Sequence, residues 1–213
     1  IGKIKMGLEY ALFKRGPLTM APSQLGLFAC SDETVETPDL EYHVQPLSLD
    51  KFGDPLHKFP AFTASVCDLR PQSRGHISIR DRDPNTAPRI APNYLSHKAD
   101  RVKAAKAIRL TRRIASQAAL APYHPEEYLP GPGFESDEEL AVAAGNIGTT
   151  IFHPVGTCKM GRDDDAKAVT DSRLRVRGLE GLRVVDASIM PTITSGNTSS
   201  PTIMIASRGA QMI

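Results

Sequence analysis

Alternation of apolar and polar residues predicts β-strands in the first third of the chain. In LEYHVQPL, Leu40, Tyr42 and Val44 alternate with polar neighbours, and in RGHISIR the apolar positions are Ile77 and Ile79. Alternation with a period of two places the apolar side chains on one face of a strand. Strands that follow one another without long helices between them indicate an antiparallel sheet.

A third strand and two loops complete this region. FTASVCDL is expected to be the strand. KFGDPLHKFP and RDPNTAPRIAPNY are expected to be loops or edge segments, because proline cannot donate a hydrogen bond to a sheet ladder. Past residue 161, RLRV and LRVVD read as short β-like pieces that follow an acidic link.

Helical patterns occupy the middle and the end of the chain. Residues 100–120 are rich in good helix formers, and a second helix is expected after Ser136, whose side chain can form a capping box with Glu139. A last helix is expected around Pro201, a residue suited to a first helical turn, with a serine at 199 or 200 as its cap. The expected buried face of the first helix carries Ala104, Ile108, Ala115 and Ala119.

Composition narrows the class of protein. The chain has 213 residues, of which 40% are hydrophobic and 23% charged, and no apolar run long enough to cross a bilayer, so we expect a soluble globular protein. A net charge of +2 without a basic stripe gives no reason to expect nucleic-acid binding. Cys30, Cys67 and Cys158 form no C-x-x-C pair, which argues against a disulfide framework and a zinc site and favours a reducing, cytoplasmic compartment.

One short stretch carries candidate chemistry. In FHPVGTCKMG, His153 stands directly before a proline, which restricts its backbone to extended angles, and Gly156 permits a sharp turn shortly after it. An imidazole fixed in this way can act as a general base near neutral pH. A nucleophilic role for the nearby Cys158 is less favoured than simple packing.

Three ordered motifs carry a family resemblance. HPVGTCKMG, LRVVDASIMP and TSGNTSSPTIMIA together resemble the carboxy-terminal signature of the glucose-methanol-choline (GMC) oxidoreductases, most closely the branch of choline dehydrogenases and related alcohol dehydrogenases. RGPLT and PQSRGHISIRDRDPNTAPRIAPNYLS are similar to the family's substrate-domain pattern. The resemblance therefore extends over nearly the whole chain.

The resemblance implies an α+β fold in two parts. Residues 8–150 would form most of the substrate-binding domain, an antiparallel-rich sheet backed by helices, and residues 151–213 would be the return segment that completes an FAD-binding α/β domain. The glycine-rich pyrophosphate motif of such a domain does not occur in the sequence. Since the chain also begins at Ile1 rather than methionine, we expect it to be the carboxy-terminal portion of a longer protein whose N-terminal FAD-binding region is absent here.

By resemblance, the complete protein would oxidise a primary alcohol to an aldehyde by hydride transfer to FAD, with His153 as the base. Asn197 would be the second catalytic residue, because its amide can donate a hydrogen bond to the substrate oxygen. The helix start near Pro201 would face the flavin with its positive dipole end. The residues expected to contact the cofactor are Asp186, Ala187, Asn197, Thr198 and Pro201, and no metal site is expected.

Other interpretations of these residues remain open. Asp186 could simply cap a turn, and Asn197-Thr-Ser fits a glycosylation sequon, although a reducing compartment opposes glycosylation. The acidic run 163–165 lacks the spacing of a calcium loop and is expected to be a solvated link. The family also includes hydroxynitrile lyases, and a fragment unable to bind FAD alone would be inactive.

The expected partners are an alcohol substrate, the N-terminal FAD-binding part of the same protein, and oxygen or a quinone-type electron acceptor. An acceptor of the second kind would bring the otherwise cytoplasmic protein to a membrane, and an oligomer is compatible with the sequence. With no tryptophan and 6% aromatic residues, no aromatic cage for choline can be identified.

Overall fold

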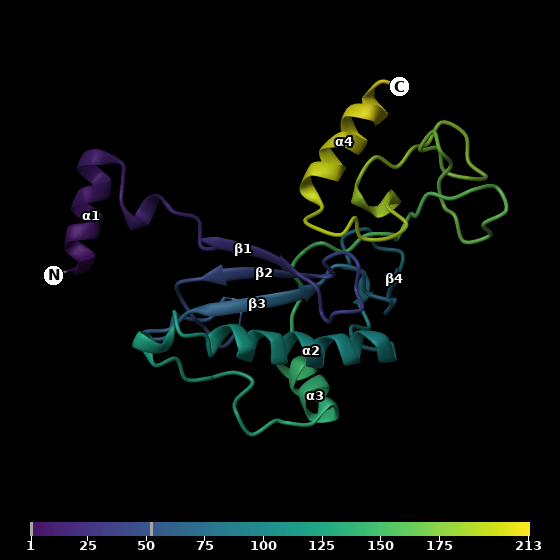
Figure 1. The fold of residues 1–213 in the computed structure, drawn as a ribbon. Helices are drawn as coiled ribbons and strands as arrows, with labels where there is room; N and C mark the ends of the chain where they lie inside the picture. Colours follow the sequence, from purple (N-terminus) through teal and green to yellow (C-terminus); the bar gives the residue numbers. More distant parts are fainter. Residues whose placement is uncertain (1, 52) are drawn as a thin grey trace.

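A three-stranded antiparallel sheet backed by helices forms the main body of the protein. The computed structural model describes residues 2–51 and 53–213. Strands β1 (Leu25–Ala29), β2 (Leu40–Gln45) and β3 (Thr63–Asp68) lie in the order β1-β2-β3, and α2 (Lys98–Ala115) runs across one face of this sheet (Figure 1). The expected antiparallel sheet is confirmed, and two of the three predicted strands belong to it as β2 and β3. The third, RGHISIR, also contains a strand, but that strand lies in a separate antiparallel pair.

Alternation along β2 produces the core beneath α2. Leu40 and Tyr42 are each 1% exposed and pack with Ala107 of α2. The Tyr42 hydroxyl lies 3.1 Å from Thr111 Oγ1 and donates to the Ala107 carbonyl oxygen at 3.3 Å, so this buried polar atom is satisfied. The residues between them, such as Glu41, face the other side of the sheet.

The remaining elements of the body are short. Strands β4 (His76–Ser78) and β5 (Arg89–Ala91) form a separate antiparallel hairpin-like pair, and β5 lies in a segment predicted as loop or edge. Helix α3 (Asp137–Ile147) packs against α2 and begins with the predicted capping box between Ser136 and Glu139. The short 3-10 turn η2 (Ala121–Tyr123) follows α2.

Helix α2 differs from its prediction in length and in its buried face. It ends at Ala115, and Ala119 is exposed. The residues buried in its body are Ala105 and Ala107 rather than the predicted stripe. The reason is that α2 lies between two partners, the sheet and α3, so small residues are buried on both sides of it.

Residues 151–213 form a second region with its own core. The predicted β-like pieces make only isolated bridges, such as Thr170↔Val176 and Arg175↔Arg183. The 3-10 turn η3 (Ala187–Ile189) and α4 (Ser199–Ala210) follow. The predicted last helix is confirmed, but Thr198 is the residue before its first turn and the two serines lie inside it. Buried members of this core are Leu174, Ile189, Met190 and Ile205.

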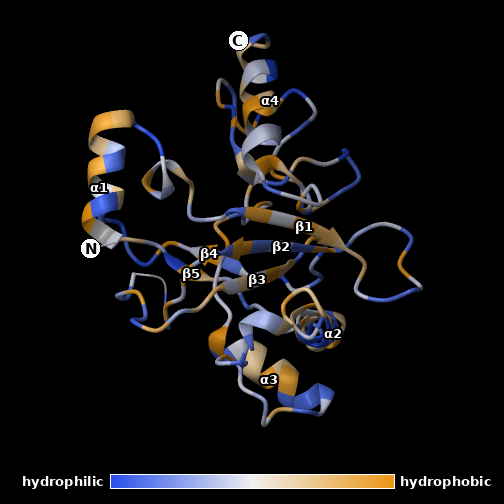
Figure 2. Ribbon diagram, turned by 60° about the vertical axis from the view of Figure 1, so that its left-hand side comes forward, coloured by the Kyte–Doolittle hydropathy of each residue, from blue (hydrophilic) through white to orange (hydrophobic). Residues whose placement is uncertain are grey.

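Helix α1 (Gly2–Phe13) lies beyond one end of the sheet and is followed by the short turn η1 (Pro17–Thr19) (Figure 1). Figure 2 shows that much of the α1 ribbon has the orange colour of hydrophobic residues. Among the described helices, none is long and apolar enough to span a membrane.

A buried carboxylate fixes the loop between β3 and β4. Asp100 of α2 is 4% exposed, and its two oxygens accept hydrogen bonds from the backbone N–H groups of Gln72 (2.8 and 3.1 Å) and Ser73 (2.7 Å). Burial alone raises the pKa of Asp100, but the hydrogen bonds from Ser73 and Gln72 outweigh it and hold the pKa below its ordinary value of 3.8. The charged form therefore stabilises the fold.

Replacing this carboxylate tests its contribution. We expect Asp100→Asn to lower the free energy of unfolding by about 1–3 kcal/mol, because one of the donors would face an amide NH₂ group and stay unpaired. Since the native pKa is depressed, the Asp100 contribution is complete above pH 3.8 and is lost as the pH falls below it. Urea denaturation across pH 2.5–7 measures both effects.

The exposed Asp164 offers the matched control. Asp164→Asn is expected to leave the free energy of unfolding within about 0.5 kcal/mol of the parent. Equal stability of the Asp100 and Asp164 variants at neutral pH would refute the anchoring role of Asp100.

Candidate active site

His153 lies on a tight segment that crosses the loop before α4. Gly156 has a φ of +92°, and a Cβ at that position would lie 3.3 Å from the Met190 carbonyl oxygen. Two backbone hydrogen bonds fix the segment: Cys158 N–H donates to the Ser188 carbonyl at 3.0 Å and Met160 N–H to the Ile189 carbonyl at 2.7 Å. The predicted turn at Gly156 is thus present, and only glycine suits it.

Both ring nitrogens of His153 contact the residues that precede α4. Asn197 Nδ2 lies 2.8 Å from Nε2, and Thr198 Oγ1 lies 2.8 Å from Nδ1. The backbone N–H of Thr198 also points to Nδ1, at 3.4 Å. The structure therefore brings together the two residues predicted to be catalytic, which are 44 positions apart in the sequence.

The accessible side of this group carries Nε2. The His153 ring is half-buried, Thr198 is 6% exposed, and Asn197 is exposed. Nε2 therefore faces the exposed Asn197, while Nδ1 faces the buried Thr198. Such a pair can accept a proton at the imidazole and donate a hydrogen bond at the amide.

The start of α4 can interact with an electron-rich group. No side-chain hydrogen bond caps this helix, and its N-terminal N–H groups begin directly after Asn197 and Thr198. Pro201 lies in its first turn. Unpaired helix N–H groups and the helix dipole favour negative charge, which suits the pyrimidine side of a flavin.

The other residues predicted to contact the cofactor have local roles. Asp186 is exposed and caps η3, because its Oδ1 accepts a hydrogen bond from Ser188 N–H at 2.8 Å. This is the capping arrangement that the sequence left open. Ala187 is half-buried against the core of residues 151–213. Contact of Asp186 and Ala187 with a cofactor stays a prediction.

Two further candidates have ordinary surroundings. Within the acidic run, Asp163 pairs with Arg177 at 3.0 Å and Asp165 pairs with Lys159 at 2.5 Å, so these carboxylates belong to surface ion pairs. Cys158 is a half-buried free thiol.

A second cluster of polar side chains lies on the sheet face opposite α2. The potential ligand atoms of Glu41, His43 and Cys67 all lie within 4.8 Å of one another. His43 Nε2 is 3.5 Å from Glu41 Oε1. Burial, with the charges of Glu41 and Asp68, raises the pKa of the Cys67 thiol to about 11, so a metal ion would have to displace its proton.

The sequence reasoning missed this cluster, although two signals were present. Glu41 and His43 are two positions apart in a strand and so share a face, and Cys67 is the cross-strand partner of Glu41. The first signal was readable from the alternation along the strand. The second depends on the register between β2 and β3, which the sequence does not reveal.

Comparisons with known proteins agree with this architecture. The family model described as GMC oxidoreductase matches residues 71–206. The chain is 42% identical over 209 residues to oxygen-dependent choline dehydrogenase 1 of Chromohalobacter salexigens, covering 98% of this chain and 37% of that protein. It thus spans little more than a third of the length of this relative.

Solved structures give the same result. Pyridoxine 4-oxidase from Mesorbium loti superposes with a TM-score of 0.80 at 29% identity, covering 89% of this chain and 37% of that one. A formate oxidase structure from Aspergillus oryzae RIB40 superposes with a TM-score of 0.86 over 100% of this chain and 41% of the other, and at 22% identity this likeness concerns the fold alone. The segment from residue 71 to residue 206, which holds His153, Asn197 and the start of α4, places the chain in the GMC oxidoreductase family.

Proposed function

We propose that the chain is the carboxy-terminal part of an FAD-dependent enzyme that oxidises a primary alcohol to an aldehyde. The observation that carries the proposal is the 2.8 Å contact between His153 Nε2 and the Asn197 amide at an accessible site. Membership of the GMC family, whose members generally bind FAD, and similarity to choline dehydrogenases support it.

Two residues of the chain would carry the proton chemistry. His153 Nε2 takes the hydroxyl proton of the alcohol, and the Asn197 amide donates a hydrogen bond to the oxygen as negative charge develops on it. The alcohol oxygen takes the place next to Nε2 that the Asn197 amide nitrogen occupies in the free chain. FAD, when bound, would accept the hydride from the carbon atom that carries the hydroxyl group.

The residues fit only one side of this cofactor. The uncapped start of α4, with Asn197 and Thr198 before it, suits the electron-rich end of the flavin ring. The sequence contains no glycine-rich loop for the pyrophosphate. We therefore assign the binding of the pyrophosphate to an N-terminal part of the same protein.

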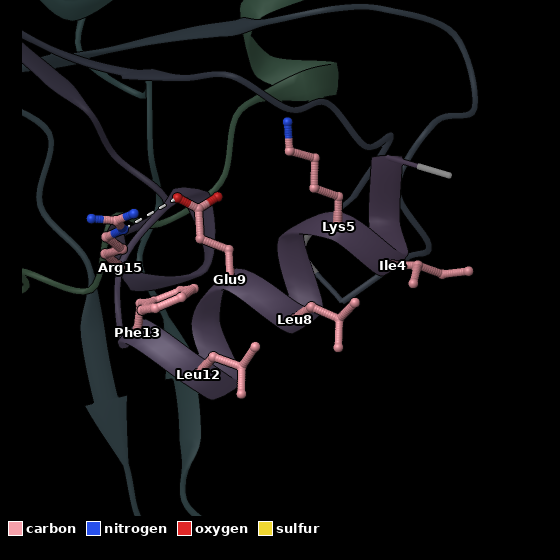
Figure 3. Close-up of a pocket in the computed structure, with 7 residues that line it drawn as sticks. All are labelled: Ile4, Lys5, Leu8, Glu9, Leu12, Phe13 and Arg15. Atoms are coloured by element: carbon pink, nitrogen blue, oxygen red, sulfur yellow. Dashed lines mark ion pairs between the residues drawn. The ribbon is translucent and has the colours of Figure 1, made fainter.

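Exposed apolar side chains support the presence of that second part. On α1, Ile4, Leu8 and Leu12 are 56–70% exposed and point away from the rest of the chain (Figure 3). A stripe of this kind on a helix normally packs against another element. The choline dehydrogenase of C. salexigens has additional chain beyond the matched part, since the match covers 37% of its length.

Substitution of the proposed base tests the function. In the flavin-loaded protein, His153→Ala is expected to lower kcat/KM for alcohol oxidation by about 10²- to 10⁴-fold, since general-base catalysis is typically of that size. His124→Asn is the matched control, because His124 is exposed and has a left-handed φ of 46° that asparagine tolerates. We expect this control to retain activity.

Near-normal oxidation by the His153→Ala protein would contradict the proposed role. Stopped-flow absorbance distinguishes an oxidoreductase from a hydroxynitrile lyase. An oxidoreductase bleaches its flavin when alcohol is added. A lyase would release cyanide from a cyanohydrin while its flavin stays oxidised.

Charged residues placed among the exposed apolar side chains of α1 (Ile4, Leu8 and Leu12) test whether the N-terminal part of the protein packs there. We expect Leu8→Glu combined with Leu12→Glu to lower the flavin content of the purified complete protein at least about twofold, because buried unpaired carboxylates oppose packing. Tyr10→Glu is the control, since Tyr10 is 41% exposed and lies on the opposite side of α1. The ratio of flavin absorbance to protein measures the effect, and equal ratios for all variants would argue against packing at this stripe.

A further inference from the structure

Thr198 occupies an unusual position relative to α4. It is the residue before the first turn of the helix, and threonine in that place commonly uses its hydroxyl to accept a hydrogen bond from a backbone N–H of the turn. Here the helix has no such bond, and the hydroxyl lies 2.8 Å from His153 Nδ1 instead. A side chain that departs from its usual local role often marks a functional position.

The surroundings hold this hydroxyl in place. Thr198 is 6% exposed. Its carbonyl oxygen accepts hydrogen bonds from Thr202 N–H at 3.0 Å and from Thr202 Oγ1 at 2.6 Å. The backbone at Thr198 is therefore fixed by the first turn of α4, and a side chain that turned away from His153 would leave its buried hydroxyl without this hydrogen-bond partner.

The contacts at the two ring nitrogens define which one carries the proton. An amide nitrogen can only donate, so Asn197 Nδ2 donates to Nε2, and Nε2 is the unprotonated nitrogen of the neutral ring. The ring proton then lies on Nδ1, where it is donated to Thr198 Oγ1 at 2.8 Å. The Thr198 N–H also points at Nδ1, at 3.4 Å, and on its own it would favour an unprotonated Nδ1. The shorter hydroxyl contact at Nδ1 and the Asn197 amide at Nε2, both at 2.8 Å, outweigh this long contact.

We propose that Thr198 is a positioning residue that keeps the ring proton of His153 on Nδ1 and thereby keeps the lone pair on Nε2, where the substrate hydroxyl would take the place of the Asn197 amide. The inference rests on the proposed function, in which Nε2 takes the hydroxyl proton. That proton moves from the alcohol oxygen to Nε2 and the ring becomes a cation with a proton on each nitrogen. Thr198 Oγ1 accepts the hydrogen bond from Nδ1–H before and after the transfer, so nothing at Nδ1 must reorganise.

Loss of the hydroxyl would favour the other tautomer, because the Asn197 amide can turn and accept a hydrogen bond from Nε2–H through its Oδ1. In Thr198→Val, the shape is kept but the acceptor is removed, and the partner left for Nδ1 is the backbone N–H of residue 198, which can only donate. A ring that accepts at Nδ1 carries its proton on Nε2 and cannot act as a base there. Thr198→Ser restores the hydroxyl and is the matched control.

Nitrogen-15 NMR of histidine-labelled, flavin-loaded protein measures the tautomer directly. His153→Ala identifies the His153 signals by their disappearance. We expect the Nδ1–H form in the parent and in Thr198→Ser, and a shift toward Nε2–H in Thr198→Val. Thr198→Ala provides the same test if the valine variant does not fold. An unchanged tautomer in a folded variant without the hydroxyl would overturn the proposal.

Steady-state kinetics give the second measurement. We expect kcat of Thr198→Val to fall by about 10-fold or more with KM changed by less than about 3-fold, because the loss concerns proton transfer and not binding. Thr198→Ser should stay within about 3-fold of the parent. Full activity of Thr198→Val beside an inactive His153→Ala would refute the role of Thr198 and leave the proposed function intact. An active His153→Ala would refute the proposed function, while the NMR result still decides the tautomer.

Discussion

The position of α2 on the sheet depends on Lys103, which lies between two carboxylates. Its Nζ is 3.2 Å from Asp39, just before β2, and 2.8 Å from Asp68 at the end of β3. Burial lowers the pKa of Lys103, but Asp68 and Asp39 more than compensate and leave it raised. Asp39 also accepts hydrogen bonds from Ser31 N–H and Oγ, so the charges are paired on several sides, as buried ions require. Helix α3 packs against α2 and the loop after β3 is held by Asp100 of α2, so the positions of both depend on α2.

The sequence predicted the elements whose signals are local. The alternation in LEYHVQ and the capping box at Ser136 and Glu139 act over a few residues, and both are present in the structure. Strand β1 was not predicted, because LGLFA has no alternation and four of its five residues are exposed. The predicted buried face of α2 was wrong for a related reason. Because α2 is buried on two sides, its sequence has no single apolar stripe that marks the buried face.

At the candidate site too, local motifs were predictable from the sequence, whereas contacts that depend on tertiary structure were not. His153 and Asn197 were found through motifs, but their contact depends on how the segment around Gly156 crosses the residues before α4. The contact of Thr198 with the ring could not be read from the sequence, because threonine before a helix predicts a capping hydroxyl. Spacing along the chain carries no information about which of two possible partners a side chain chooses once tertiary structure has formed.

The separation of His153 from α4 along the chain has a consequence for biosynthesis. During translation, His153 emerges 44 residues before Asn197, and in that interval neither ring nitrogen has its later partner. The imidazole can be oriented only after the start of α4 has been made and has folded back over the Gly156 turn. A nascent chain therefore acquires the geometry around His153 only after Asn197 and Thr198 have been made and have folded against the ring.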